Sequence, residues 1–151
     1  MFADYLPIGV FLALVFCAAT TGALFSPGPW YESLAKPSWT PPNWLFPVAW
    51  TVLYLMIGIA GWLVWKADGF GLALVLWGVH LAFNAAWSYF MFGAQRIDYA
   101  MYDVTGMWVT MVAFMLVAWP VSQTAVLLFV PYLAWVSFAA VLNWRIWELN
   151  A

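Results

Sequence analysis

The chain has 151 residues, of which 68% are hydrophobic and 7% are charged, with a net charge of −2. Its mean hydropathy is +0.93. In an average soluble protein about a quarter of the residues are charged, so this composition excludes a soluble globular domain and indicates an integral membrane protein. So few basic groups also exclude a nucleic-acid-binding surface.

Apolar runs long enough to cross a bilayer predict five transmembrane helices. Each crossing needs about 20 apolar residues. In chain order we expect helices over Leu6–Phe25, Trp44–Trp65, Phe70–Phe92, Tyr99–Trp119 and Thr124–Trp147. Open strands would leave backbone groups unpaired in lipid, and the alternating pattern of a membrane barrel is missing. The sequence therefore predicts an all-α membrane protein, a five-transmembrane-helix bundle forming a single domain over residues 1–151.

The first expected helix contains Cys17, the single cysteine of the chain. It cannot form an internal disulfide, and its apolar surroundings predict a small buried side chain. The N-terminus lacks the basic region of a cleavable signal. We therefore expect this run to remain as the first membrane span.

Residues 26–43 form a long connection rich in proline and tryptophan. The stretch KPSWTPPNWLFPVAWTVLY, residues 36–54, contains four prolines and three tryptophans. Proline fixes φ and lacks an N–H, so we expect a stiff, folded cap that is not one regular helix. The rings suit either an interfacial aromatic belt or a preorganised lid over a hydrophobic cavity. Because belt residues need no proline framework, the pattern favours the lid.

Two expected helices carry stripes that combine aromatic rings with small residues. The stripes are Trp50, Tyr54, Gly58 and Gly61 in the second helix and Tyr132, Trp135, Ala139 and Asn143 in the fifth. Such stripes leave space between helices for a planar, largely apolar ligand. The alternative is ordinary core packing, which is the commoner role of rings at helical spacing and which composition alone favours.

The third expected helix has two opposite faces. One face holds Trp77, His80, Asn84, Trp87 and Ser88, and the other holds Gly78, Ala82 and Ala86. The small-residue face predicts close helix packing, either inside the bundle or in a homodimer. Polar groups at membrane depth are costly, so Asn84 and His80 are either functional or engaged in hydrogen bonds between helices. A single histidine without companion ligands favours no metal site.

The few charges suggest an orientation for the bundle. Lys36, Arg96 and Arg145 are expected on one side of the membrane and Lys66 on the other. The positive-inside rule then predicts a cytoplasmic C-terminus. Asp103 enters the fourth helix about one turn from its start, where the sequence allows it to snorkel, to pair with a polar group or to be neutral.

Three regions resemble the signature regions of the TspO/translocator-protein family, also called tryptophan-rich sensory proteins and peripheral-type benzodiazepine receptor-like proteins. They are WYESLAKPSWTPPNWLFPVAWTVLY (30–54), LAFNAAWSYFMF (81–92) and PYLAWVSFAAVLNWRIWELN (131–150). The resemblance spans essentially the whole chain. It implies that the Pro/Trp-rich first loop closes one end of a ligand cavity. The implied ligand is a porphyrin such as protoporphyrin IX or another hydrophobic molecule, and the resemblance implies no obligatory cofactor. It also implies that the protein is a homodimer.

The resemblance also implies which residues line that cavity. The matching positions are Trp30, Trp39, Trp50, Tyr54, Asn84, Trp87, Trp135, Ala139 and Asn143. The family's sterol-associated pattern has a tyrosine where this chain has Trp144 before Arg145, which puts sterol binding in doubt. The short chain without a targeting extension resembles the bacterial branch and implies a bacterial membrane.

Three functions follow from the resemblance. The first is a receptor that binds a tetrapyrrole in the membrane and takes part in tetrapyrrole handling and stress regulation. The second is an enzyme of light-dependent porphyrin breakdown, which would depend on indole chemistry because the sequence offers no hydrolytic triad, paired carboxylates or metal cluster. The third is a tetrapyrrole or sterol transporter, although broken-helix repeats and paired intramembrane charges are missing. The sequence ranks the receptor first.

Overall fold

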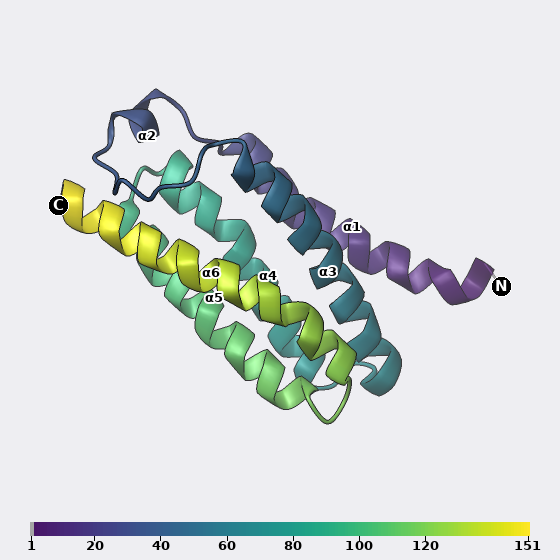
Figure 1. The fold of residues 1–151 in the computed structure, drawn as a ribbon. Coiled ribbons are helices and arrows are strands. Elements are labelled where there is room, and N and C mark those ends of the chain that lie inside the picture. The colour runs from purple at the N-terminus through teal and green to yellow at the C-terminus, as the bar shows by residue number, and fades with distance from the viewer. Residues whose placement is uncertain (1) are drawn as a thin grey trace.

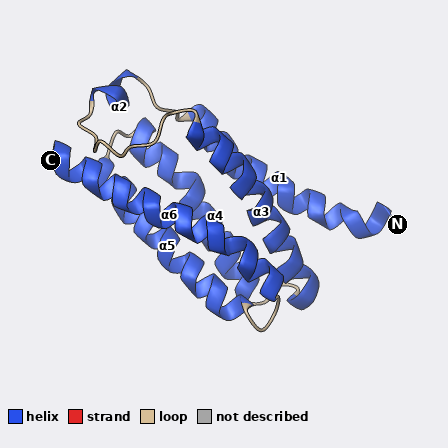
Figure 2. Cartoon of the chain, in the orientation of Figure 1, coloured by secondary structure: helices blue, strands red, loops and turns tan. Residues whose placement is uncertain are grey.

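Helices make up almost all of the protein. The computed structural model describes residues 2–151, in which helices are joined by loops and no strand occurs (Figure 2). Five helices are long and apolar enough to cross a membrane. They are α1 (Phe2–Leu24), α3 (Leu45–Asp68), α4 (Leu72–Ser88) with its π-helical extension η1 (Tyr89–Gly93), α5 (Ile97–Ala118) and α6 (Gln123–Asn150). The prediction of a five-helix membrane protein is confirmed.

The five long helices form an up-and-down bundle (Figure 1). Helix α4 packs along α5, α5 packs along α6, and α3 contacts both α1 and α6. The N-terminal end of α1 projects away from the other helices in Figure 1, and Phe2 and Leu6 there are exposed. Helix α1 therefore contributes one packed edge to the bundle and leaves much of its surface to the surrounding lipid.

The helix ends follow local backbone chemistry. Helix α3 ends at Asp68, and the next residue, Gly69, has a φ of 62°, a conformation that suits glycine. An added Cβ at Gly71 would clash only with the carboxylate of exposed Asp68, which can move aside, and the φ of Gly71 is an ordinary −78°. The expected third helix is not α-helical to its end, because η1 replaces the last turn. The chain then turns through Gln95, which has a φ of 55°.

The first loop, residues 25–44, is folded as the prolines predict. It contains one short helix, α2 (Pro29–Ser33), which begins at a proline. Beyond α2, the Lys36 ammonium donates hydrogen bonds to the carbonyl oxygens of Tyr31, Glu32 and Leu34 at 2.7, 3.2 and 3.2 Å. The same ammonium lies 4.7 Å from the centroid of the Tyr31 ring. Burial of that ring raises the pKa of the Tyr31 hydroxyl.

The bundle is closely packed near the α3–α4 turn. The Trp77 indole lies against Gly61, where an added Cβ would come within 2.5 Å of the ring. Its N–H donates to the Ile57 carbonyl oxygen at 3.0 Å. Gly58 is covered in the same way by Leu12 of α1. The two glycines of the α3 stripe therefore accommodate neighbouring helices, which is the core-packing alternative that composition favours.

The first loop, the η1 turn and the C-terminus lie at one end of the bundle (Figure 1). Lys36, Arg96 and Arg145 belong to this end, and Lys66 belongs to the opposite end. This is the distribution of basic residues from which the positive-inside rule predicts the orientation. The cytoplasmic position of the C-terminus stays a prediction.

Candidate functional site

A continuous row of aromatic rings leads from the first loop into the middle of the bundle. We call it the aromatic row, and its members are Trp39, Phe46, Trp50, Tyr54, Tyr132, Trp135 and Phe138. They come from the first loop, α3 and α6, three segments far apart in the sequence. Each ring centroid lies 5.4–6.5 Å from that of at least one other member. These separations are typical of favourable aromatic contacts.

The loop end of the row begins at Trp39. Its ring meets Phe138 at 5.6 Å between centroids, and Phe138 in turn meets Trp135 at 5.9 Å. Trp39 nevertheless stays 45% exposed. An aromatic side chain held by a proline-rich loop and covered on only one side has surface available for a further flat molecule.

The inner end of the row is polar. The Tyr54 hydroxyl donates to Asn84 Oδ1 at 3.2 Å, and Asn84 Nδ2 donates to the Tyr132 hydroxyl at 2.8 Å. Tyr132 donates onward to the Met107 sulfur at 3.6 Å. Asn84 therefore links α3, α4 and α6 through one side chain, and both sides of its amide are engaged, as a buried amide requires.

A second polar pair lies closer to the loop end of α4. The Trp87 N–H donates to Asn143 Oδ1 at 3.0 Å, and Asn143 Nδ2 donates to the Ile97 carbonyl oxygen at 3.2 Å. Phe92 of η1 packs on the Trp87 ring at 5.5 Å between centroids. Through these contacts Asn143 joins α4 to the start of α5.

The Trp135 N–H is buried and has no hydrogen-bond partner. Rings surround it, with Phe46, Trp50 and Phe138 at centroid distances of 5.8, 6.5 and 5.9 Å. A buried donor without a partner costs about 1–3 kcal/mol. An acceptor on a bound molecule would remove that cost, so the aromatic row contains a ready donor at its centre.

One basic and one acidic side chain, His80 and Asp103, are also buried in the bundle. His80 Nδ1 contacts the Trp77 carbonyl oxygen, and its ring packs on Phe129 and Tyr132 at 5.2 and 5.7 Å. His80 Nε2 and Asp103 Oδ2 lack partners. Among residues 2–151 no group of three or more His, Cys, Asp or Glu side chains is placed to hold a metal ion.

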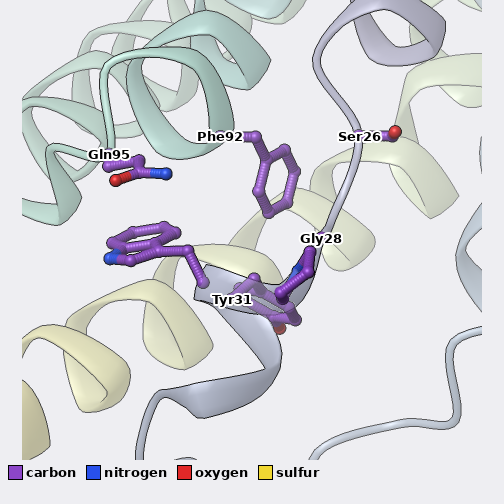
Figure 3. A pocket seen from close by; sticks show the side chains of 7 residues that line it. Ser26, Gly28, Tyr31, Phe92 and Gln95 are labelled. Carbon is purple, nitrogen blue, oxygen red and sulfur yellow. The ribbon is translucent and has the colours of Figure 1, made fainter.

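Two predicted cavity residues, Trp30 and Ala139, belong neither to the row nor to the two polar groups. Trp30 lines a hollow of about 100 Å³ between the start of the first loop and η1, together with Tyr31, Phe92 and Gln95 (Figure 3). Ala139 is half-buried on α6. It lies four residues from both Trp135 and Asn143, so it occupies the same face of that helix between the row and the second polar pair.

Phe46 and Phe138 belong to the row but not to the set implied by the resemblance. Tyr132 appeared in the α6 stripe without being assigned to the ligand. The sequence feature that connects them to the row is helical spacing, since Phe46 lies four residues before Trp50 and Phe138 lies three after Trp135. Spacing alone does not show that α3 and α6 face each other, so these residues can be assigned to the row only from the tertiary structure.

The opposite face of α4 is uncovered in one copy of the chain. Gly78 and Ala82 are exposed and Ala86 is half-buried. Gly78 and Ala82 line an open groove of about 290 Å³ with Leu14 and Cys17 of α1. Cys17 is exposed, so the expectation that it is buried is wrong. Its side chain lies on the groove face of α1, whereas the neighbouring Val15 and Ala18 are buried in the core.

These features define the class of protein. It is a polytopic helical membrane protein whose interior holds an aromatic row with a polar end, covered by a structured loop. A family model described as TspO/MBR family matches residues 10–148. The chain belongs to this family.

The similarity to individual relatives is also extensive. The chain is 41% identical over 145 residues to Protein CrtK of Rhodobacter capsulatus, covering 93% of this chain and 91% of the relative. It is 42% identical over 140 residues to a tryptophan-rich sensory protein of Cereibacter sphaeroides, covering 93% and 89%. It is 40% identical over 130 residues to the human translocator protein, covering 80% and 75%. The resemblance seen in the sequence is confirmed at the level of the family.

Proposed function

We propose that this protein is a membrane receptor that binds a porphyrin or a related flat, hydrophobic molecule along the aromatic row. The observation that carries the proposal is the junction of edge-to-face and tilted aromatic contacts with an unsatisfied hydrogen-bond donor at Trp135. A tetrapyrrole combines a broad apolar face with carboxylate side chains. The row matches both properties, because its rings offer stacking surface and its free indole N–H is a donor for an oxygen acceptor.

The polar end of the row supports the same ligand class. Asn84 and the hydroxyls of Tyr54 and Tyr132 lie beyond the rings, where the edge of a flat molecule would end. Small-molecule sites are commonly mostly apolar with a few placed polar groups that fix orientation. We assign Trp39, Trp50, Tyr54, Asn84 and Trp135 to direct ligand contact.

Trp30, Trp87, Ala139 and Asn143 complete the proposed site as its border on the loop side. The Trp87–Asn143 hydrogen bond holds α4 and α6 together there. We expect these residues to shape the entrance more than to contribute stacking area.

Titration of the purified protein in detergent with protoporphyrin IX tests the proposal. Saturable quenching of tryptophan fluorescence with a shifted porphyrin absorption band supports it. Trp50→Ala removes the central ring of the row and should weaken binding at least about tenfold. Trp119→Ala, at an exposed tryptophan beyond the row, is the matched control and should bind as the wild type does. Equal binding by both variants would contradict the proposed site.

Light-dependent porphyrin breakdown is the second candidate function. The indoles of Trp50 and Trp135 lie 6.5 Å apart between centroids and nearly perpendicular, at 89°. Indoles in contact with a photoexcited porphyrin bound along the row would be suited to electron transfer, with dioxygen as the oxidant. Accelerated loss of porphyrin in light, abolished by replacing these indoles, would favour breakdown over binding as the function.

We also propose that the protein forms a homodimer through α4. The exposed Gly78 and Ala82 leave a surface on which a second helix can approach closely, as small residues permit in membranes. Ala82→Phe should hold the helices apart and yield a monomer in detergent by sedimentation and cross-linking. The control variant Val109→Phe, at an exposed position of α5, should leave the dimer intact. A dimer unchanged by Ala82→Phe would contradict this interface.

A further inference from the structure

One side chain at the C-terminal end of α6, Asn150, makes hydrogen bonds to the backbone of the first loop. Asn150 Oδ1 accepts the Ala35 N–H at 2.9 Å, and Asn150 Nδ2 donates to the Ala35 carbonyl oxygen at 2.8 Å. Nδ2 also donates to the Ile146 carbonyl oxygen at 2.7 Å, which anchors the amide on its own helix. Figure 1 shows the C-terminus beside the loop. The two residues are 115 positions apart in the sequence.

The chemistry of the contact is specific to an amide side chain. The N–H and the carbonyl of one residue present a donor and an acceptor side by side, and a primary amide offers the complementary pair. An aspartate has no donor, and an aliphatic side chain has neither group. Asn150 therefore holds Ala35 as a neighbouring strand would, in a loop that otherwise has no partner for these backbone groups.

Local hydrogen bonds restrain the loop between Ala35 and Trp39. The next residue, Lys36, holds three carbonyls of the α2 region through its ammonium. Pro37 follows, and its carbonyl accepts both the backbone N–H and the hydroxyl of Thr40, at 3.1 and 2.7 Å. A turn closed in this way has little freedom, so we expect a movement of Ala35 to shift the Trp39 ring on Phe138.

We infer that Asn150 is a positioning residue for the ligand site: it latches the first loop so that Trp39 covers the loop end of the aromatic row. The inference rests on the proposed function only for its effect on a ligand. The latch itself is a property of the ligand-free protein. Asn150 is exposed and touches no member of the row in the hydrogen bonds it makes, so it acts through the loop.

The latch is tested first without ligand. Hydrogen–deuterium exchange of peptides covering residues 31–40 should be at least about fivefold faster in Asn150→Ala than in the wild type, because the Ala35 N–H loses its acceptor. Asn150→Asp, which keeps an acceptor and loses the donor, should fall between the two. Leu149→Ala, an exposed neighbour on α6, is the control and should exchange as the wild type does. Unchanged exchange in Asn150→Ala would overturn the latch.

The effect on the site is tested by stopped-flow mixing with protoporphyrin IX. A looser lid should raise the association and dissociation rates together, the dissociation rate about fivefold to tenfold, while the thermal stability of the ligand-free protein stays as in Leu149→Ala. Faster exchange with unchanged porphyrin rates would overturn the positioning role. A wild type that binds no protoporphyrin IX would instead contradict the proposed function, and the exchange experiment would still decide whether the latch exists.

Discussion

Trp77 and Trp135 are interior indoles of the same bundle, yet their surroundings differ. Near the α3–α4 turn, Trp77 fills the space left by Gly61 and donates its N–H to the Ile57 carbonyl. Toward the first loop, Trp135 lies among other rings with its buried N–H unpaired. The first environment is complete within the protein. The second lacks an acceptor, which a ligand can supply, so the comparison separates tryptophan used for packing from tryptophan available for recognition.

The largest expected effect is on stability at the packed end. Trp77→Ala removes a buried ring and a satisfied hydrogen bond, and should lower the free energy of unfolding by about 3–5 kcal/mol. Thermal unfolding in detergent measures the loss. Trp135→Ala, the matched change at the other end, should cost clearly less because no hydrogen bond is lost. Equal losses would show that both indoles serve packing alone.

A smaller effect is expected from the lid. Trp39→Ala removes a half-exposed ring that packs on Phe138, and should weaken protoporphyrin IX binding about tenfold. The midpoint of thermal unfolding of the ligand-free protein should change little, because much of the ring already faces solvent. Fluorescence titration and thermal unfolding on the same preparations give both values. A parallel loss of stability and affinity would identify Trp39 as an interfacial belt residue.

The indole N–H itself can be isolated with a conservative change. Trp135→Phe keeps an aromatic ring and removes only the unpaired donor and part of the ring area. We expect about threefold to tenfold weaker binding of protoporphyrin IX and an unchanged or slightly higher stability, since an unsatisfied buried donor disappears. Trp77→Phe is the control, for which stability should fall instead. Unaltered affinity in Trp135→Phe would show that its N–H does not meet the ligand.

The smallest expected effect concerns light. If the protein is a receptor, illumination in the presence of dioxygen should destroy protoporphyrin IX at one rate in the wild type, in Trp50→Phe and Trp135→Phe, and in protein-free detergent once occupancy is matched. Decay of the porphyrin absorption band measures that rate. Many turnovers to one defined product in the wild type, lost in both variants at saturating porphyrin, would establish breakdown as the function.

The number and length of the membrane helices follow from the sequence by itself, because bilayer thickness sets the length of an apolar run. The prolines of the first loop likewise exclude a continuous helix there, whatever the loop packs against. The two faces of α4 also follow from local spacing: Trp77, His80 and Asn84 are buried, and Gly78 and Ala82 are exposed. Each of these properties depends on a local stretch of chain and its surrounding solvent.

The tertiary structure decided how the faces meet. Spacing within α3 and α6 does not show that Tyr54 and Tyr132 share Asn84, because that requires the rotation and depth of three helices relative to one another. Spacing within α3 likewise does not show that Trp77 of α4 packs against Gly61. The latch between Asn150 and Ala35 joins two segments whose local sequences carry no sign of each other. Contacts between helices depend on packing over the whole bundle, and a sequence pattern describes only one of the two surfaces in each contact.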